Sequence, residues 1–369
     1  MKRRIFLVLF FLILPVCFCI PALASETDFE KELMRRSGAA ELYASLDNDT
    51  QDLLSAAGIE GPVWKSEDEN LLKVFTELFR EKLSAPVTAL GALMAVVILC
   101  KLGSSFEPGE TGGLISLATA VACGAVAVTP LLELMRTTRQ AVETTGGFLL
   151  AAVPVYAALM IASGNAAAGG TYSIFTLAAG NAIPLIASMI IFPTLHVLLA
   201  LALINSVSEL HMERLASTVY GAAKWLLVLV VSVFSGILSV QTALSAQLDA
   251  AGGKAAKLMV SAAIPIVGSA LGDAVQAIKG SVDLLKSGVG AFGILAALCI
   301  LAPTAIEAAL WIAVCSAGQI LGDLFNVPKI SAFLGACGNV AKMLLAVIVS
   351  TGVVAVVTAA LLLFVKGSL

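Results

Sequence analysis

Charged residues are scarce in this chain, and histidine is nearly absent. Only 13% of the 369 residues are Asp, Glu, Lys or Arg, against about a quarter in a typical soluble domain. Hydrophobic residues make up 59% of the chain, and the formal net charge is −3. This composition indicates a polytopic membrane protein. The negative net charge excludes a protein that binds nucleic acid mainly by neutralising phosphates.

The residue patterns that most often carry catalysis are missing as well. His196 and His211 show no HExxH spacing and have no third metal ligand in view. The chain has no Walker lysine loop and no GxSxG elbow. Two LGD triplets lack the first glycine of a GxGD intramembrane protease, because Ala270 and Ile320 stand there. We therefore expect no enzymatic activity, cofactor or metal, and expect His196 to make a helix-packing hydrogen bond or to relay a proton.

Cysteine usage also points away from a metal site or a disulfide framework. The sequence contains no CxxC pair and no cluster of cysteine with histidine. Five of the seven cysteines lie in or beside apolar runs: Cys100, Cys123, Cys299, Cys315 and Cys337. We predict that these five are small core residues.

The N-terminal 24 residues have the pattern of a secretory signal peptide. Basic residues 2–4 precede an apolar stretch, and Ala22 and Ala24 are the small residues at −3 and −1 of a cut before Ser25. An uncleaved signal anchor is the alternative. Residues 25–85 carry 14 of the 25 acidic residues but only 7 basic ones. We expect this segment to be extracytoplasmic, to become helical towards the first span, and to dock on other protein.

Residues 86–369 are predicted to form the membrane domain. A span needs about 20 apolar residues, and about seven segments qualify, with a range of six to eight: 86–102, 114–132, 147–163, 172–208, 219–240, 289–317 and 340–365. Pro184 and Pro193 predict a helical hairpin or a broken helix within 172–208. The charges at 133–143 are assigned to a loop between two spans. The predicted fold class is an all-α polytopic membrane protein.

Residues 261–290 combine an apolar, Pro-broken entry with regularly spaced charges. On a helix, Leu271, Val275, Ile278, Val282, Leu285 and Val289 form one stripe. Asp273 and Asp283 lie opposite, whereas Lys279 and Lys286 lie at the margin, from which their ammonium groups would reach water. We predict an amphipathic or re-entrant helix at about 268–287. Its polar face either lies in the membrane interface or turns inward, towards a water-filled path or another subunit.

Glu307 is the acidic residue placed most deeply in an apolar run. Ionisable side chains within a membrane are costly, and they usually face a cavity or a partner. Glu307 is therefore expected to face a polar cavity or a partner subunit, or else to lie near an interface. Lys224 and Lys342 are closer to predicted helix starts and are expected to extend towards the headgroups.

An ordered set of motifs in the C-terminal half resembles the stage III sporulation protein AE family. These are FSGILSVQT (234–242), GKAAKLMVSAAIPIVGSALGDAVQAIKGSVDLLKSGVGAFG (253–293), APTAIE (302–307) and GQILGD (318–323). The resemblance extends from about Lys224 to the C-terminus. The positions that match the family pattern are Gln241, Lys254, Lys257, Pro265, Gly268, Asp273, Lys286 and Gly290.

The resemblance implies a subunit of the channel-like, secretion-like complex of endospore development. Such a subunit would be permease-like and non-enzymatic, and would lie in the mother-cell membrane around the forespore. Its implied partners are other membrane subunits, a separate ATPase subunit and lipid, and homo-oligomerisation is left open. Asp273, Lys279, Asp283 and Lys286 would then be a polar face for assembly. The second hypothesis is a stand-alone secondary transporter with a midplane site at the Pro-broken helices.

Overall fold

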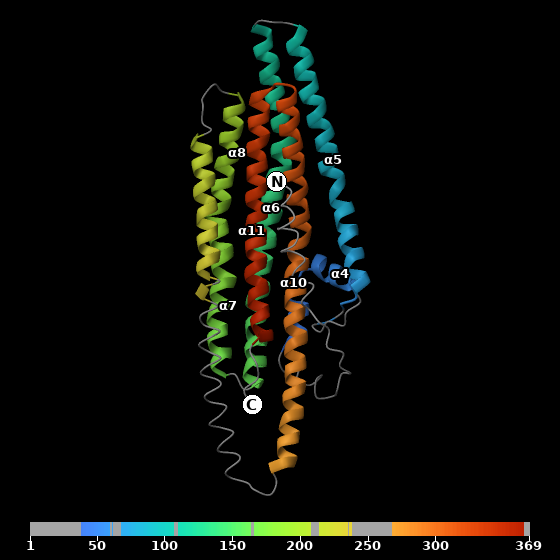
Figure 1. Cartoon of the computed structure of the whole chain (residues 1–369), viewed down its shortest axis with the longest axis vertical. Helices are drawn as coiled ribbons and strands as arrows, with labels where there is room; N and C mark the ends of the chain where they lie inside the picture. Colours follow the sequence, from blue (N-terminus) through green and yellow to red (C-terminus); the bar gives the residue numbers. More distant parts are fainter. Residues whose placement is uncertain are drawn as a thin grey trace.

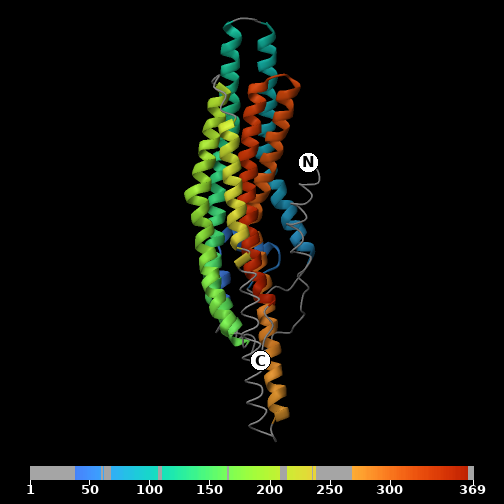
Figure 2. The ribbon, with the colours of Figure 1, turned by 60° about the vertical axis from the view of Figure 1, so that its left-hand side comes forward.

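The computed structural model describes residues 38–59, 61, 68–106, 110–163, 166–207, 214–234, 236–237 and 268–364. The predicted signal peptide lies outside these residues. Inside some helices only the backbone is described, and Asp273, Lys279 and Asp283 are among these positions. The described part is an elongated bundle whose long helices lie along one axis (Figures 1 and 2).

The bundle contains two short helices and several very long ones. The bounds are α3 Ala39–Ala44, α4 Asn48–Ala56, α5 Asp68–Phe106, α6 Glu110–Ala162, α7 Ala166–Ile186, the π-helical turn η1 Ala187–Ile191, α8 Phe192–Val207, α10 Gly268–Leu324 and α11 Pro328–Phe364. A further helix, Arg214–Phe234, carries no label and is yellow in Figure 1. No strand occurs among the described residues, as expected for the predicted all-α class.

Six described helical segments are long and apolar enough to cross a membrane. They are Lys73–Leu99, Val121–Ala162, Thr176–Ser206, Arg214–Phe234, Leu285–Leu324 and Pro328–Ala360. About seven spans were predicted because residues 114–132 and 147–163 were counted separately, whereas both belong to α6. The chain therefore has the character of a multi-pass membrane protein.

Helix α6 continues through the charged stretch that the sequence assigned to a loop. Its 53 residues include Glu133 and Arg136, and Arg139 and Glu143. These pairs stand three and four residues apart and form ion pairs along the exposed face of the helix. Such pairs support a helix rather than a turn, and Leu134, Met135, Gln140 and Ala141 between the charges are good helix formers. The assignment of 133–143 to a loop was therefore wrong.

The long apolar stretch around Pro184 and Pro193 is likewise one continuous helix instead of a hairpin. Helix α7 passes into α8 through the π-helical turn η1, which lies between the two prolines. A π turn is a common response where the regular backbone ladder of a helix is disturbed. The prolines therefore alter the local winding without reversing the chain.

Helix α10 joins two segments that were predicted as separate elements. The amphipathic segment at about 268–287 and the following span lie on one 57-residue helix. No glycine or proline signal stops the helix between them: Gly290 and Gly293 lie within it and are buried or closely packed. In Figures 1 and 2 the first part of α10 extends beyond the end of α11.

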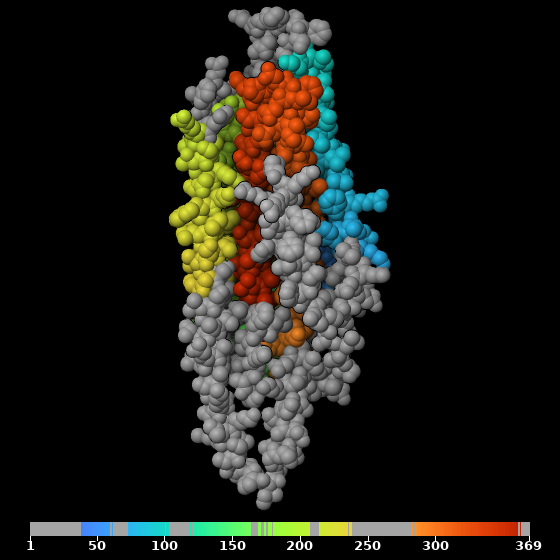
Figure 3. Space-filling model, in the orientation of Figure 1, coloured from blue at the N-terminus to red at the C-terminus, as the bar shows by residue number. Residues whose placement is uncertain are grey.

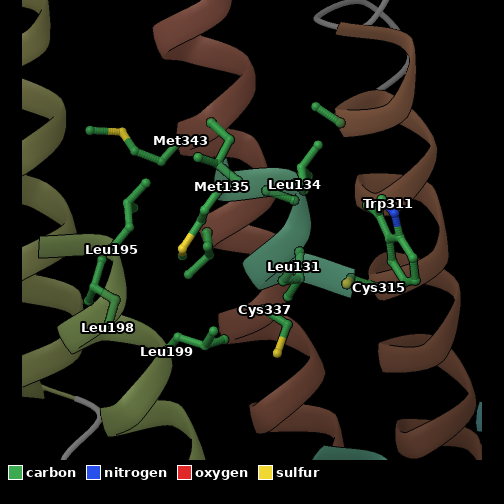
Figure 4. Close-up of a cluster of buried hydrophobic side chains, with 14 of the residues drawn as sticks. Leu131, Leu134, Met135, Leu195, Leu198, Leu199, Trp311, Cys315, Cys337 and Met343 are labelled. Carbon is green, nitrogen blue, oxygen red and sulfur yellow. The ribbon is translucent and has the colours of Figure 1, made fainter. Parts of the chain in front are cut away.

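Two hydrophobic clusters hold the bundle together. The larger one joins α5, α6, α8, the Arg214–Phe234 helix, α10 and α11. Figure 4 shows its centre, where Leu131 and Leu134 of α6 meet Leu195 of α8, Trp311 of α10 and Met343 of α11. The second cluster joins α3 and α4 to the end of α6, the middle of α10 and the end of α11. Figure 3 shows α10 and α11 between α5 on one side and the Arg214–Phe234 helix on the other.

The short N-terminal helices are shaped by local capping. The Asp47 side chain accepts hydrogen bonds from the backbone N–H of Thr50, at 3.4 Å, and from its hydroxyl, at 2.7 Å. Asp47 is therefore the N-cap of α4. After α4, Gly58 has a φ of +79°, and the N–H of Ile59 bonds to the carbonyl of Leu54 at 2.8 Å. This left-handed end turns the chain back and buries Ile59 against the bundle.

Candidate functional site

Of the four residues of the predicted polar face on α10, the structure describes the side chain of Lys286, which is buried. Lys286 is 3% exposed, so its ammonium group does not reach water as the sequence suggested. Val282, Leu285 and Val289 of the predicted apolar stripe are also buried. Lys286 is covered because α3, α4, the end of α6 and the end of α11 surround this part of α10. These elements come from distant parts of the chain, which the local pattern could not reveal.

The other charged positions of this segment are placed by helix register alone. At 100° per residue, Lys279 and Asp283 share an arc of about 60° with Lys286 and Gly290. Asp273 lies about 80° further around the helix. Gly268 is the first residue of α10, and Gly290 is buried. The remaining family-motif positions, Gln241, Lys254, Lys257 and Pro265, lie outside the described residues.

Glu307 lies at the place where α10 meets α5 and α6. Its side chain is half-buried, and the charges that act on it are Lys82 of α5, attractive, and Glu133 of α6, repulsive. Glu307 was predicted from the sequence, but its neighbours could not be predicted because they belong to helices far away in the chain. The structure therefore brings one carboxylate from α10 to the level of the charged stretch in α6.

We call the charges at this level the belt: Lys82, Glu133, Arg136, Arg139, Glu143 and Glu307. Arg136 donates to Glu133 with its closest N–O distance at 2.7 Å, and Arg139 donates to Glu143 at 2.9 Å. The side chains of these two pairs are 52–72% exposed on the outer face of α6. The belt therefore presents charges of both signs on the outside of the bundle.

The GQILGD motif forms the close contact between α10 and α11. A β-carbon at Gly318 would lie 2.8 Å from Leu334, and one at Gly322 would lie 3.1 Å from Ser331. The hydroxyl of Ser331 donates to the carboxylate of Asp323. Asn326 takes a positive φ of 53° at the end of α10, a conformation that asparagine tolerates. The motif therefore allows α10 and α11 to pack closely as a helical hairpin. Its Gly-x-x-x-Gly spacing is the sequence signal that could have predicted this contact.

The structure describes His196 and four of the five cysteines predicted to be core residues. His196 donates from Nδ1 to the carbonyl oxygen of Phe192, at 2.8 Å, within its own helix. Cys123, Cys315 and Cys337 are buried in the larger cluster, and Cys299 is half-buried. The prediction of small core cysteines is confirmed for these residues. His211 lies outside the described residues.

Comparison with known proteins places this bundle among sporulation proteins. The profile of the family described as "Stage III sporulation protein AE" matches residues 59–365. Stage III sporulation protein AE of Bacillus subtilis (strain 168) is 26% identical over 254 residues, which are 68% of this chain and 63% of that relative. The match thus spans less than two thirds of the relative's length. No solved structure matches the chain.

These matches confirm the family that the motifs suggested, and this family is not a known enzyme family. The matched region contains all six described helical segments of membrane-spanning length. With most of its length covered by the family profile, the chain belongs to the stage III sporulation protein AE family, as a sporulation-related membrane protein.

Proposed function

We propose that this chain is a non-enzymatic membrane subunit of the channel-like complex that serves endospore development. It would lie in the mother-cell membrane around the forespore, with its N-terminal segment extracytoplasmic. Its partners would be other membrane subunits and a separate ATPase subunit. Family membership supports a role in sporulation, and the described helices support a multi-pass protein.

The length of the helices is the observation that carries the assembly role. With 53 residues, α6 is about 80 Å long, whereas the hydrocarbon core of a bilayer is about 30 Å thick. Large apolar side chains are exposed near both ends of α6, at Val121 and Ile161. Apolar surface that extends beyond the bilayer requires cover from other protein. This geometry favours a subunit of a larger assembly.

The stand-alone transporter is less well supported by the described residues. A midplane site at broken helices needs unwound backbone and free half-helix ends. The chain stays helical from α7 through η1 to α8, and Met189 and Ile190 of η1 point outward as exposed side chains. Pro265, the other proline invoked for such a site, lies outside the described residues.

Purification from sporulating cells tests the proposal. The tagged full-length chain would be expressed in a spore-forming host that lacks its own copy, and membranes would be extracted in mild detergent. We expect an assembly of several membrane proteins with an ATPase, identified by mass spectrometry. Recovery of a lone monomer that catalyses ion-coupled uptake in vesicles would instead establish the transporter.

A double substitution tests the proposed polar face within the same experiment. We expect Asp273→Ala with Asp283→Ala to reduce spore yield and co-purification while the chain still inserts into the membrane. Asp49→Ala with Asp52→Ala, at exposed acids of α4, is the matched control and should leave both unchanged. Wild-type sporulation in the Asp273/Asp283 variant would show that these carboxylates are not part of the assembly surface.

A further inference from the structure

The belt divides the long helices into two apolar halves. The turn half extends from the belt to the α5–α6 turn, at the top of Figure 1, and contains most of the larger cluster. The N-terminal half extends the other way and contains the second cluster with α3 and α4. Residues 110–132 of α6 measure about 34 Å and residues 144–162 about 28 Å. Either length suits one bilayer, but the two together do not.

The belt itself is unsuited to the centre of a bilayer. Its ion pairs lie on the exposed face of α6, with all four side chains more than half exposed. Ionised side chains that face hydrocarbon are costly, and such residues normally face the bundle interior or lie near the headgroups. The belt is therefore a boundary, and the bilayer covers the helices on one side of it.

Helix α5 shows which side that is. On its N-terminal half, Lys73, Glu77, Arg80 and Glu81 are exposed within nine residues. On its turn half, residues 83–100 contain no Asp, Glu, Lys, Arg or His, and Val87, Ile98 and Leu99 are exposed. These four charges directly precede Lys82 of the belt, whereas a bilayer around the turn half meets no charged side chain along residues 83–100 of α5, with Lys101 at the far end of this stretch.

The docked helices α3 and α4 independently indicate that the bilayer surrounds the turn half. Helices α3 and α4 pack Leu42, Leu54 and Ile59 against α6 and α10 in the second cluster. Their outer surface is acidic and exposed, with Glu41, Asp47, Asp49 and Asp52. A face of this composition belongs in water. The part of the bundle that it covers therefore stands outside the hydrocarbon.

We propose that the lipid bilayer surrounds only the turn half, with the belt at its headgroup layer. The N-terminal half then projects from the membrane as a helical extension on the side of the N-terminal segment. The end of α11 lies on this side as well, because Ala359 and Leu362 share the second cluster with Leu42. Residues 147–163 are accordingly part of the extension rather than a separate span.

Lipid contact at single positions tests this placement. An environment-sensitive fluorophore would be attached to one cysteine at a time in a chain whose native cysteines are replaced by alanine. The turn-half positions are Ile98, Val121 and Ile320, and the N-terminal-half positions are Ile161, Ile174 and Leu177, all exposed. The full-length chain would be reconstituted in phosphatidylethanolamine–phosphatidylglycerol vesicles with or without phosphatidylcholine brominated on its acyl chains.

We expect brominated lipid to quench the turn-half positions and to leave the N-terminal-half positions unchanged. Cover of the N-terminal half by a second protein copy would not produce quenching there, so self-association through that half does not alter this expectation. Quenching at Ile161, Ile174 and Leu177, with or without quenching of the other three, would overturn the proposal, and so would the absence of quenching in the turn half. If the cysteine-free chain does not fold, a genetically encoded fluorescent amino acid in the native chain gives the same measurement. The readout is independent of sporulation, so its outcome is separate from that of the proposed complex.

Discussion

At the scale of single residues, the close helix contacts depend on glycines that leave no room for a side chain. A β-carbon at Gly146 of α6 would lie 2.7 Å from the carbonyl oxygen of Gly180 and 2.7 Å from Pro184, both in α7. Gly180 is crowded in turn by Leu150 and by the carbonyl of Gly146. Small residues that allow such an approach are the usual means of packing helices in membranes.

Two adjacent glycines give a prediction with its own control. Gly146→Ala should destabilise the α6–α7 contact by about 1–3 kcal/mol, because the added carbon meets backbone and a rigid proline ring. Gly147→Ala should stabilise the chain by about 0.5–1 kcal/mol, because its site is open and alanine favours a helix. Thermal unfolding in detergent, followed by a dye that reacts with newly exposed cysteines, measures both. Equal effects of the two substitutions would contradict this account of the contact.

Gly293 and Tyr156 give a second prediction at the residue scale. A β-carbon at Gly293 would lie 1.8 Å from the Tyr156 hydroxyl oxygen, in the second cluster. Gly293→Ala should therefore destabilise the protein, and Tyr156→Phe should reduce that loss because the clashing oxygen is removed. The four proteins of this double-mutant cycle would be compared by the same thermal assay. Additive effects would show that the two sites do not interact in this way.

At the scale of elements, the α10–α11 hairpin shows how a short motif specifies a junction. The N–H of Val327 bonds to the carbonyl of Gly322 at 2.8 Å, and the N–H of Asn326 to that of Asp323 at 3.1 Å. These two bonds are those of a Schellman ending. Pro328 then begins α11 at a position where a missing N–H costs nothing.

The α10–α11 hairpin can be tested by comparing a glycine that faces rigid backbone with one that faces a flexible side chain. An alanine at Gly322 would meet the backbone of Ser331 at 3.1 Å, whereas an alanine at Gly335 would meet the flexible end of Gln319 at 3.2 Å. We expect Gly322→Ala to speed hydrogen exchange of the amides around the turn, and Gly335→Ala to change it little. Hydrogen exchange with mass spectrometry measures this. Unchanged exchange in Gly322→Ala would mean that the helices accommodate the extra carbon.

The helices show which features a sequence pattern can predict. The periodic stripe that buries Val282, Leu285 and Val289 was predicted correctly, because helix register is a local property. The loop predicted at 133–143 was wrong, and so was the hairpin, one of the two alternatives predicted at Pro184 and Pro193. In both cases a turn was inferred from charge or proline alone, although ion pairs and a π turn keep the helix continuous. The burial of Lys286 and the neighbours of Glu307 depend on elements far away in the chain, and no local pattern contains them.

At the scale of the whole molecule, the N-terminal segment is an integral part of the fold. Leu54 is fully buried between α4 and the bundle. Leu54→Ala should weaken the docking of α3 and α4 by about 2–5 kcal/mol, as expected for a buried leucine. Asp52→Ala, on the exposed side of α4, is the control.

Limited proteolysis of the detergent-solubilised chain measures this docking. We expect residues 38–59 to become susceptible in the Leu54 variant while fragments of the long helices stay resistant. Protection equal to that of Asp52→Ala would show that the segment is held by other contacts.

The make-up of the second cluster also sets an order of events during biosynthesis. Ile59 and Ala359 belong to the same cluster but are about 300 residues apart in the chain. At roughly 5–20 residues per second, a ribosome completes α11 about 15–60 s after the N-terminal segment has been made. Throughout that interval the cluster around Leu42, Leu54 and Ile59 lacks its α11 residues. A newly made chain would therefore benefit from a chaperone that shields these side chains until α11 has been synthesised.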